Sequence, residues 1–112
     1  MLRALITAIV TTISAVSLGQ TSYELSLDSQ RQAGTPQGEI IQLRFEESGI
    51  YRNTERDWWI YVPDQHDGQT PAALMVFQDG AAYLNETGPI RVPVVFVNLI
   101  HRGEMPVTIG VF

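Results

Sequence analysis

The stretch Ala72-Ala-Leu-Met-Val-Phe-Gln-Asp-Gly-Ala-Ala-Tyr83 decides the fold of this chain. Its first six residues are apolar without polar alternation, which is typical of a strand covered on both faces, as in an α/β sheet. The run ends abruptly in the polar turn Gln78-Asp79-Gly80. Because α/β proteins place binding and catalytic groups at the ends of such strands, this turn is the first candidate for a functional site.

Two strands are expected before this run. Apolar and polar residues alternate over residues 39–46, the pattern of a half-buried strand. Residues 58–62 combine aromatic and β-branched side chains and are closed by Pro63, which favours a second strand.

A helix and a further strand are expected after the run. Apolar residues within 91–102 recur at helical spacing, Pro93 suits the first turn of a helix, and Gly103 suits its end. The valines favour helix only weakly, so a strand over 94–97 is the alternative. Residues 107–112 predict another buried strand, which we expect to have no later neighbour. The order strand-strand-strand-helix-strand assigns the chain to the α/β class.

The N-terminal residues have the layout of a secretory leader. Met1-Leu-Arg3 is positively charged, residues 4–18 are largely apolar, and small residues at Ala15, Ser17 and Gly19 suit cleavage. The apolar core is short and contains threonines and serines, which favours cleavage over a retained membrane anchor. We therefore expect residues 1–19 to be removed and the protein to be exported, to the periplasm or outside the cell, without a stable membrane anchor.

The remaining residues divide into a lead-in and one domain. Residues 20–38 are rich in Gln, Ser, Thr, Gly and Pro and predict a flexible lead-in, whereas residues 39–112 hold the predicted elements. The net charge is −5, and the seven basic residues, all arginine, are scattered, which argues against nucleic-acid binding. The lack of cysteine excludes disulfides and a thiolate zinc site.

Five segments together resemble a known family. In chain order they are Asp28-Ser-Gln-Arg-Gln, Thr54-Glu-Arg-Asp-Trp-Trp-Ile-Tyr-Val-Pro63, Leu74-Met-Val-Phe-Gln-Asp-Gly-Ala-Ala-Tyr83, Val92-Pro-Val-Val-Phe-Val-Asn-Leu-Ile100 and Gly103-Glu-Met-Pro-Val-Thr-Ile-Gly110. In this order they are similar to the N-terminal part of the esterases of the enterochelin-esterase-like (esterase D) group, over residues 23–112. The resemblance implies an incomplete α/β-hydrolase sheet, serine hydrolysis of a small-molecule or polysaccharide-linked ester, and no cofactor.

The resemblance also implies which part of an active site is present. In α/β-hydrolases the nucleophilic serine lies in a Gly-x-Ser-x-Gly turn, with an acid and a histidine further along. This sequence has no such turn, so none of the triad is assigned, and we expect a truncated portion that is inactive by itself. The loop after the third strand supplies one oxyanion-hole amide, for which Gly80 or Ala81 is the candidate donor. Gln78 and Asp79 could orient this loop or contact the substrate.

An ordinary turn is the alternative for the same residues. In that case Asp79 bonds local amides and Gly80 supplies a positive φ.

Other polar residues suggest no further site. His66, between two aspartates, fits no zinc pattern and predicts a solvated turn, and no metal site is expected. His101 is expected at a helix end. Adjacent Glu46 and Glu47 would point to opposite faces of a strand and could not form a glycosidase pair. The dipeptide Arg56-Asp57 suggests a surface ion pair or turn contact rather than a substrate clamp.

The rival function is a small secreted glycan- or protein-binding module without catalysis. Trp58, Trp59 and Tyr61 could hold a glycan or a protein partner. One of the two tryptophans must face the core of a half-buried strand, however, which weakens an aromatic platform.

Overall fold

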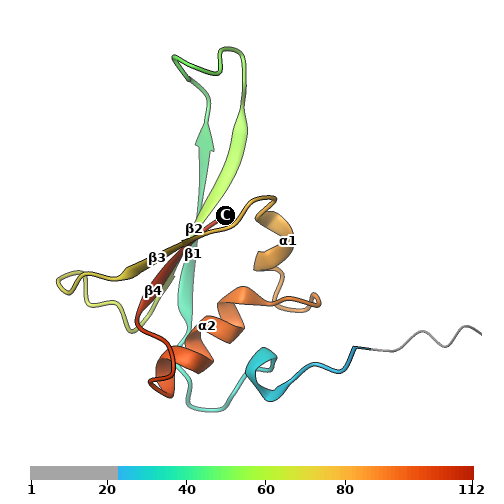
Figure 1. Cartoon of the computed structure of the whole chain (residues 1–112), viewed down its shortest axis with the longest axis vertical. Helices are drawn as coiled ribbons and strands as arrows, with labels where there is room; N and C mark the ends of the chain where they lie inside the picture. Colours follow the sequence, from blue (N-terminus) through green and yellow to red (C-terminus); the bar gives the residue numbers. More distant parts are fainter. Residues whose placement is uncertain (1–22) are drawn as a thin grey trace, which may run out of the picture.

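The computed structural model describes residues 23–112 (Figure 1). Its elements are the 3-10 helix η1 (Leu27–Ser29), β1 (Gly38–Phe45), β2 (Arg56–Pro63), β3 (Ala73–Val76), α1 (Ala81–Leu84), α2 (Val92–His101) and β4 (Thr108–Val111). The expected leader and its cleavage site lie outside the described residues. Within residues 23–112, no helix has the length and apolar character needed to cross a membrane.

The four predicted strands and the predicted helix are confirmed, and the chain is a mixed α/β structure. The strands form one sheet in the order β1-β2-β4-β3. β1 and β2 form an antiparallel hairpin, and β4 runs antiparallel to β2 and parallel to β3. Residues 94–97 are helical, so the alternative of a strand there is wrong.

The last strand of the chain lies inside the sheet and not at its edge. β4 lies between β2 and β3, and the free edges belong to β1 and β3. The reason is the crossover through α2, which lets the chain return parallel to β3 and insert β4 on its inner side.

Both ends of α2 form as the sequence predicts. Pro93 lies in the first turn. Gly103 has a φ of 72°, and the amides of Gly103 and Glu104 donate to the carbonyls of Ile100 and Leu99, each at 3.0 Å. These two bonds form a Schellman motif, which satisfies the last carbonyls of the helix.

The core lies between α2 and one face of the sheet. Figure 1 shows α1, α2 and η1 gathered on the same side of the strands. The aromatic rings of Tyr61 and Phe96 meet edge-on, with their centroids 6.2 Å apart. The buried apolar cluster consists of Tyr61, Val92, Phe96, Val97, Ile100 and Phe112.

β3 is not covered on both faces, contrary to the prediction. All four of its residues are exposed, and Leu74 and Val76 keep 66% and 67% of their surface. The unbroken apolar run correctly indicates a strand. It cannot indicate what lies over the strand, because that depends on the position of β3 at the edge of the sheet.

The lead-in contains an element that the sequence pattern did not reveal. Buried Asn98 of α2 donates from Nδ2 to the carbonyls of Asp28 and Gln30, each at 2.8 Å. Arg102 pairs with the Asp28 carboxylate at 2.6 Å. These contacts hold η1 against α2. Because the anchors are polar side chains of a distant helix, no apolar periodicity in the lead-in could predict them.

Tyr61 provides a test of the core. Burial raises the pKa of Tyr61 to about 12, and its buried hydroxyl has no hydrogen-bond partner among the described residues. The contribution of neutral Tyr61 to the free energy of unfolding is therefore fully present below pH 10, the ordinary pKa of tyrosine. It is lost as the pH rises towards 12, the pKa of Tyr61 in the folded chain. We expect Tyr61→Phe to leave the free energy of unfolding unchanged or raised at neutral pH, since it removes an unpaired hydroxyl.

Urea unfolding from neutral to strongly alkaline pH measures this effect. Tyr61→Phe should lose less stability than the parent chain as pH rises above about 10. Tyr83→Phe, at a half-buried position, is the matched control and should retain the parental loss. Equal alkaline losses in Tyr61→Phe and the parent would contradict the assignment.

Candidate functional site

The turn after β3 lies beside the end of β4 and forms one wall of an open groove. The groove has a volume of about 770 Å³. It is lined by Arg56, Asp57, Trp58, Trp59, Phe77, Gln78, Asp79, Gly80, Ala81, Ala82 and Phe112. The fold therefore brings together the Arg-Asp-Trp-Trp and Phe-Gln-Asp-Gly segments, which are separated in the sequence.

The backbone of the turn differs from the ordinary turn considered as the alternative. Asp79 has a φ of 54°, whereas Gly80 has a φ of −61°. The left-handed residue is thus Asp79, and the expectation that Gly80 supplies the positive φ is wrong. Aspartate enters this conformation more readily than most residues. Among the described residues, the Asp79 side chain bonds none of the local amides.

Gly80 is a glycine because Phe112 occupies the space of a side chain. A Cβ on Gly80 would lie 2.3 Å from the Cβ of Phe112 and 2.4 Å from its Cα. Both distances are far below van der Waals contact. The structure gives packing against Phe112 as a sufficient reason for the glycine.

The amide of Ala81 has no hydrogen-bond partner among the described residues. Ala81 is the first residue of α1, and the first amides of a helix have no partner within it. Within residues 23–112, the amides of Gly80 and Ala81 donate no hydrogen bond to another backbone group, while the Gly80 carbonyl accepts from the Tyr83 amide at 2.9 Å. Ala81 is exposed and Gly80 is buried, so Ala81 is the more accessible donor.

α1 itself was missed in the sequence. It has four residues, which is too short for an apolar period to be recognised.

The polar residues of the groove are positioned by different partners. Gln78 and Asp79 are exposed on its wall. Asp57 pairs with Arg44 at 3.2 Å, so a surface ion pair forms as expected but does not involve Arg56. Arg56 instead donates from Nη1 to the carbonyl of Glu55 at 3.0 Å. Its charge remains available to the groove.

The aromatic residues separate into core and groove positions. Trp59 packs against the apolar cluster, which confirms that one tryptophan of the pair faces the core. Tyr61 is only 2% exposed, so it cannot hold a glycan, and that part of the binding-module hypothesis is wrong. Trp58 is half-buried and contributes to the groove wall.

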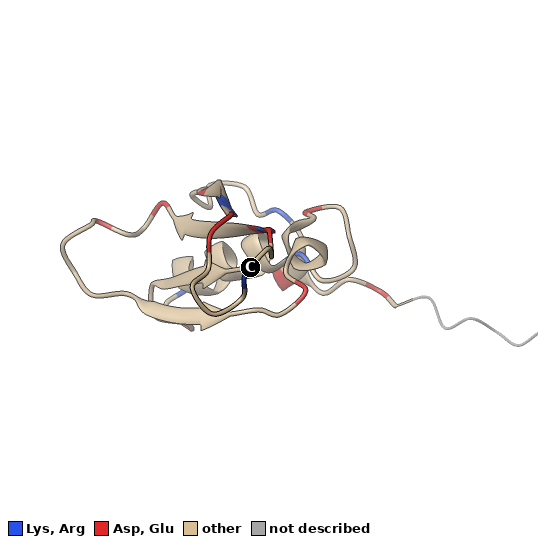
Figure 2. Cartoon of the chain, turned by 90° about the horizontal axis from the view of Figure 1, so that it is seen from above, with Lys and Arg blue, Asp and Glu red and all other residues tan. Residues whose placement is uncertain are grey.

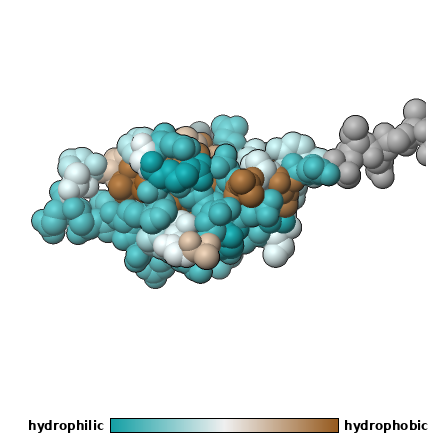
Figure 3. Space-filling model, turned by 90° about the horizontal axis from the view of Figure 1, so that it is seen from below, coloured by the Kyte–Doolittle hydropathy of each residue, from teal (hydrophilic) through white to brown (hydrophobic). Residues whose placement is uncertain are grey.

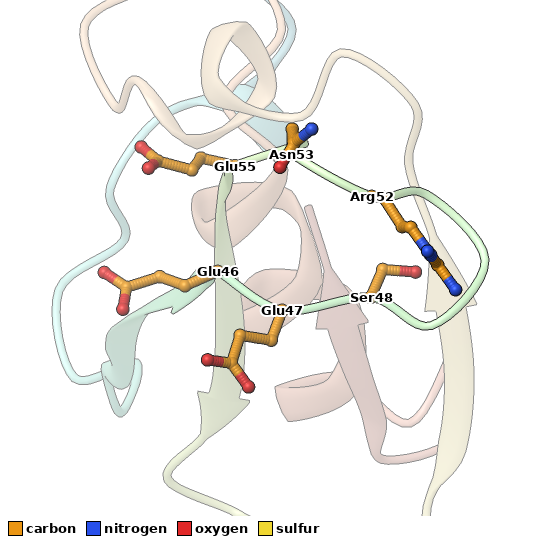
Figure 4. A pocket seen from close by; sticks show the side chains of 6 residues that line it. All are labelled: Glu46, Glu47, Ser48, Arg52, Asn53 and Glu55. Carbon is orange, nitrogen blue, oxygen red and sulfur yellow. The ribbon is translucent and has the colours of Figure 1, made fainter.

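A second hollow lies in the connection between β1 and β2 (Figure 4). It has a volume of about 690 Å³ and is lined by Glu46, Glu47, Ser48, Arg52, Asn53 and Glu55. Glu46, Glu55 and Asp57 all pair with Arg44. The hydrogen bond that the Arg44 guanidinium donates to the Glu55 carboxylate is the main reason why the pKa of Arg44 is raised. Figure 4 shows the carboxylates of Glu46 and Glu47 pointing in different directions, which does not suit a catalytic pair.

The two histidines lie outside the groove. His66 lies in a turn beside Asp67. The Asp67 carboxylate accepts hydrogen bonds from the amides of Thr70 and Gln69, at 2.7 and 2.8 Å. These bonds lower the pKa of Asp67 to about 2. His101 is exposed at the end of α2. In the described part of the chain, no three histidine, aspartate or glutamate residues gather as metal ligands would. Charged residues are spread over loops and strand ends, as Figure 2 shows.

No protein-family model matches this chain, and no curated protein is significantly similar to it. The resemblance to the esterase group therefore stays a prediction from the quoted segments. What the groove can do chemically follows from its own geometry. Within the described residues it combines the unpaired amide of exposed Ala81, apolar walls and the nearby cation of Arg56.

Gly80→Ala tests the packing of this site. We expect it to lower the free energy of unfolding by about 2–3 kcal/mol, because the added methyl group meets backbone and Cβ atoms that cannot rotate away. Ala82→Ser, on an exposed lining residue, is the control and should change stability by less than about 0.5 kcal/mol. Urea unfolding measures both. A Gly80→Ala variant as stable as the parent would show that Phe112 does not constrain the turn.

Proposed function

We propose that the chain is part of an exported serine ester hydrolase of the α/β-hydrolase type, in which the turn after β3 supplies an oxyanion-hole donor. The free amide of Ala81 on the groove wall is the observation that carries this proposal. The element order supports it, since an antiparallel strand pair followed by a parallel strand-helix-strand unit is how such a sheet begins. The expected leader supports export.

The proposed chemistry explains why a free amide is needed there. When a serine attacks an ester, the carbonyl oxygen gains negative charge, and preorganised N–H donors stabilise it. In α/β-hydrolases one donor comes from the loop after the third strand. Ala81 would serve as this donor. None of the serines in the chain lies in a Gly-x-Ser-x-Gly turn, so the nucleophile, its base and the acid would come from outside these residues.

The other groove residues would bind the substrate. Trp58 and Phe77 offer apolar surface to the acyl or alcohol part of an ester. Arg56 offers a charge that is in no ion pair among the described residues. The substrate class is a small-molecule or polysaccharide-linked ester.

The decisive experiment begins with the DNA after the Phe112 codon. An open frame that encodes Gly-x-Ser-x-Gly would be expressed as one polypeptide and assayed with p-nitrophenyl acetate. Ala81→Pro removes the proposed donor at a first helical position, where proline is tolerated. We expect kcat to fall about 10²–10³-fold, as when other enzymes lose one oxyanion-hole donor. Ala81→Ser keeps the amide and should retain the parental kcat.

Three results would contradict the proposal. An Ala81→Pro variant with the parental kcat and an unchanged circular-dichroism spectrum would show that the Ala81 amide is not an oxyanion-hole donor. A reading frame that stops after Phe112, with no Gly-x-Ser-x-Gly motif encoded in any frame downstream, would contradict the proposed hydrolase function. Conversely, serine-dependent turnover by the 112-residue chain alone would contradict a nucleophile supplied from elsewhere.

The alternative function is a secreted binding module without catalysis. The half-buried position of Trp58 in the groove is the observation that favours it. In that case oligosaccharides should change the tryptophan fluorescence of the purified chain, and Trp58→Ala should abolish the change.

A further inference from the structure

The connection between α1 and α2 carries the tripeptide Asn85-Glu86-Thr87. An asparagine followed at the second position by serine or threonine, with no proline between them, is the acceptor motif for N-linked glycans in exported proteins. Neither Asn53 nor Asn98 is followed by a hydroxyl residue at that spacing, so the motif occurs once in the sequence. A motif this short also arises by chance, so its structural context decides whether it can serve as a site.

The side-chain nitrogen of Asn85 has no partner in the described part of the chain. Asn85 is exposed and caps the end of α1. Its Oδ1 accepts hydrogen bonds from the amide of Thr87 at 3.0 Å and from the Thr87 hydroxyl at 2.8 Å. These bonds fix the oxygen, and the nitrogen takes no part in them. The amide nitrogen is therefore available as an acceptor.

The turn that carries Asn85 is held by hydrogen bonds that a modification would not disturb. The amide of Gly88 donates to the Asn85 carbonyl at 3.1 Å and closes the turn over the motif. Arg91 donates to the carbonyls of Thr87 and Gly88, at 3.3 and 2.6 Å. In Figure 1 the connection between α1 and α2 lies at the outer margin of the helical side, away from the strands. A group attached to the side-chain nitrogen would break none of these bonds.

The surroundings of the motif suit a hydrophilic adduct. The face seen in Figure 3 is largely hydrophilic, and apolar side chains form a few patches on it. All three residues of the motif are polar, and Thr87 is exposed together with Asn85. Asn85 does not line the groove, so a glycan on it is compatible with an oxyanion donor at Ala81.

We propose that Asn85 accepts an N-linked glycan when the chain is exported through a eukaryotic-type secretory pathway. The donor is an oligosaccharide carried on a polyprenyl diphosphate. The side-chain nitrogen of Asn85 forms a bond to the anomeric carbon of this oligosaccharide, and gives one proton to a base of the transferase. The bond from that carbon to the diphosphate oxygen breaks, and the polyprenyl diphosphate leaves with the electron pair. This acceptor role rests on the expected export and not on esterase activity.

Expression in a yeast host that glycosylates exported proteins tests the proposal. The chain is expressed once with its own residues 1–19 and once with these replaced by the leader of a well-secreted host protein. Secreted and cell-retained chains are both analysed, because the glycan is transferred before secretion. We expect slower migration in gel electrophoresis, which peptide-N-glycosidase should abolish. Mass spectrometry should then show aspartate at position 85, since this glycosidase converts the asparagine from which it releases a glycan.

Three variants separate the acceptor from the fold. Asn85→Asp keeps an oxygen that can accept from Thr87 and removes the nitrogen, so it should be produced like the parent but without the shift in migration. Thr87→Ala should also lose the shift, because the motif requires a hydroxyl. Thr87→Ser keeps that hydroxyl, is the matched control, and should retain the shift.

Two results would overturn the proposal. One is a parent chain that carries no glycan with either leader. The other is a glycosidase-sensitive shift that persists in Asn85→Asp. A glycan found only with the replacement leader would support Asn85 as the acceptor and contradict the predicted export, so the two can be told apart.

Discussion

The structure depends on the position of Phe112 at the end of β4. Its amide and its carbonyl each bond Trp59 of β2 at 2.8 Å. Its ring stacks on Phe77 at a centroid distance of 4.6 Å and an angle of 3°. Its Cα and Cβ occupy the space beside Gly80. One residue thus joins β2, β4 and the turn after β3, and it also lines the groove.

This packing also explains the shape of the turn. The chain leaves β3 with Phe77 stacked on Phe112 and must then pass close to the Phe112 backbone at Gly80. The left-handed conformation is taken by Asp79, one residue earlier, and α1 begins one residue later. A helix that starts so close to the strand leaves the Ala81 amide without a partner. Packing alone therefore explains why the Ala81 amide is unpaired, whether or not the amide has a catalytic role.

Periodicity in the sequence predicted the local elements because local forces produce them. The alternation before Phe45 and the Pro93 and Gly103 signals all act within a few residues. The features that were missed or misplaced depend on distant partners. Asn98 lies some seventy residues after η1 in the sequence and holds it through its own side-chain amide. The exposure of β3 follows from its place at the sheet edge, which no property of its own residues reveals.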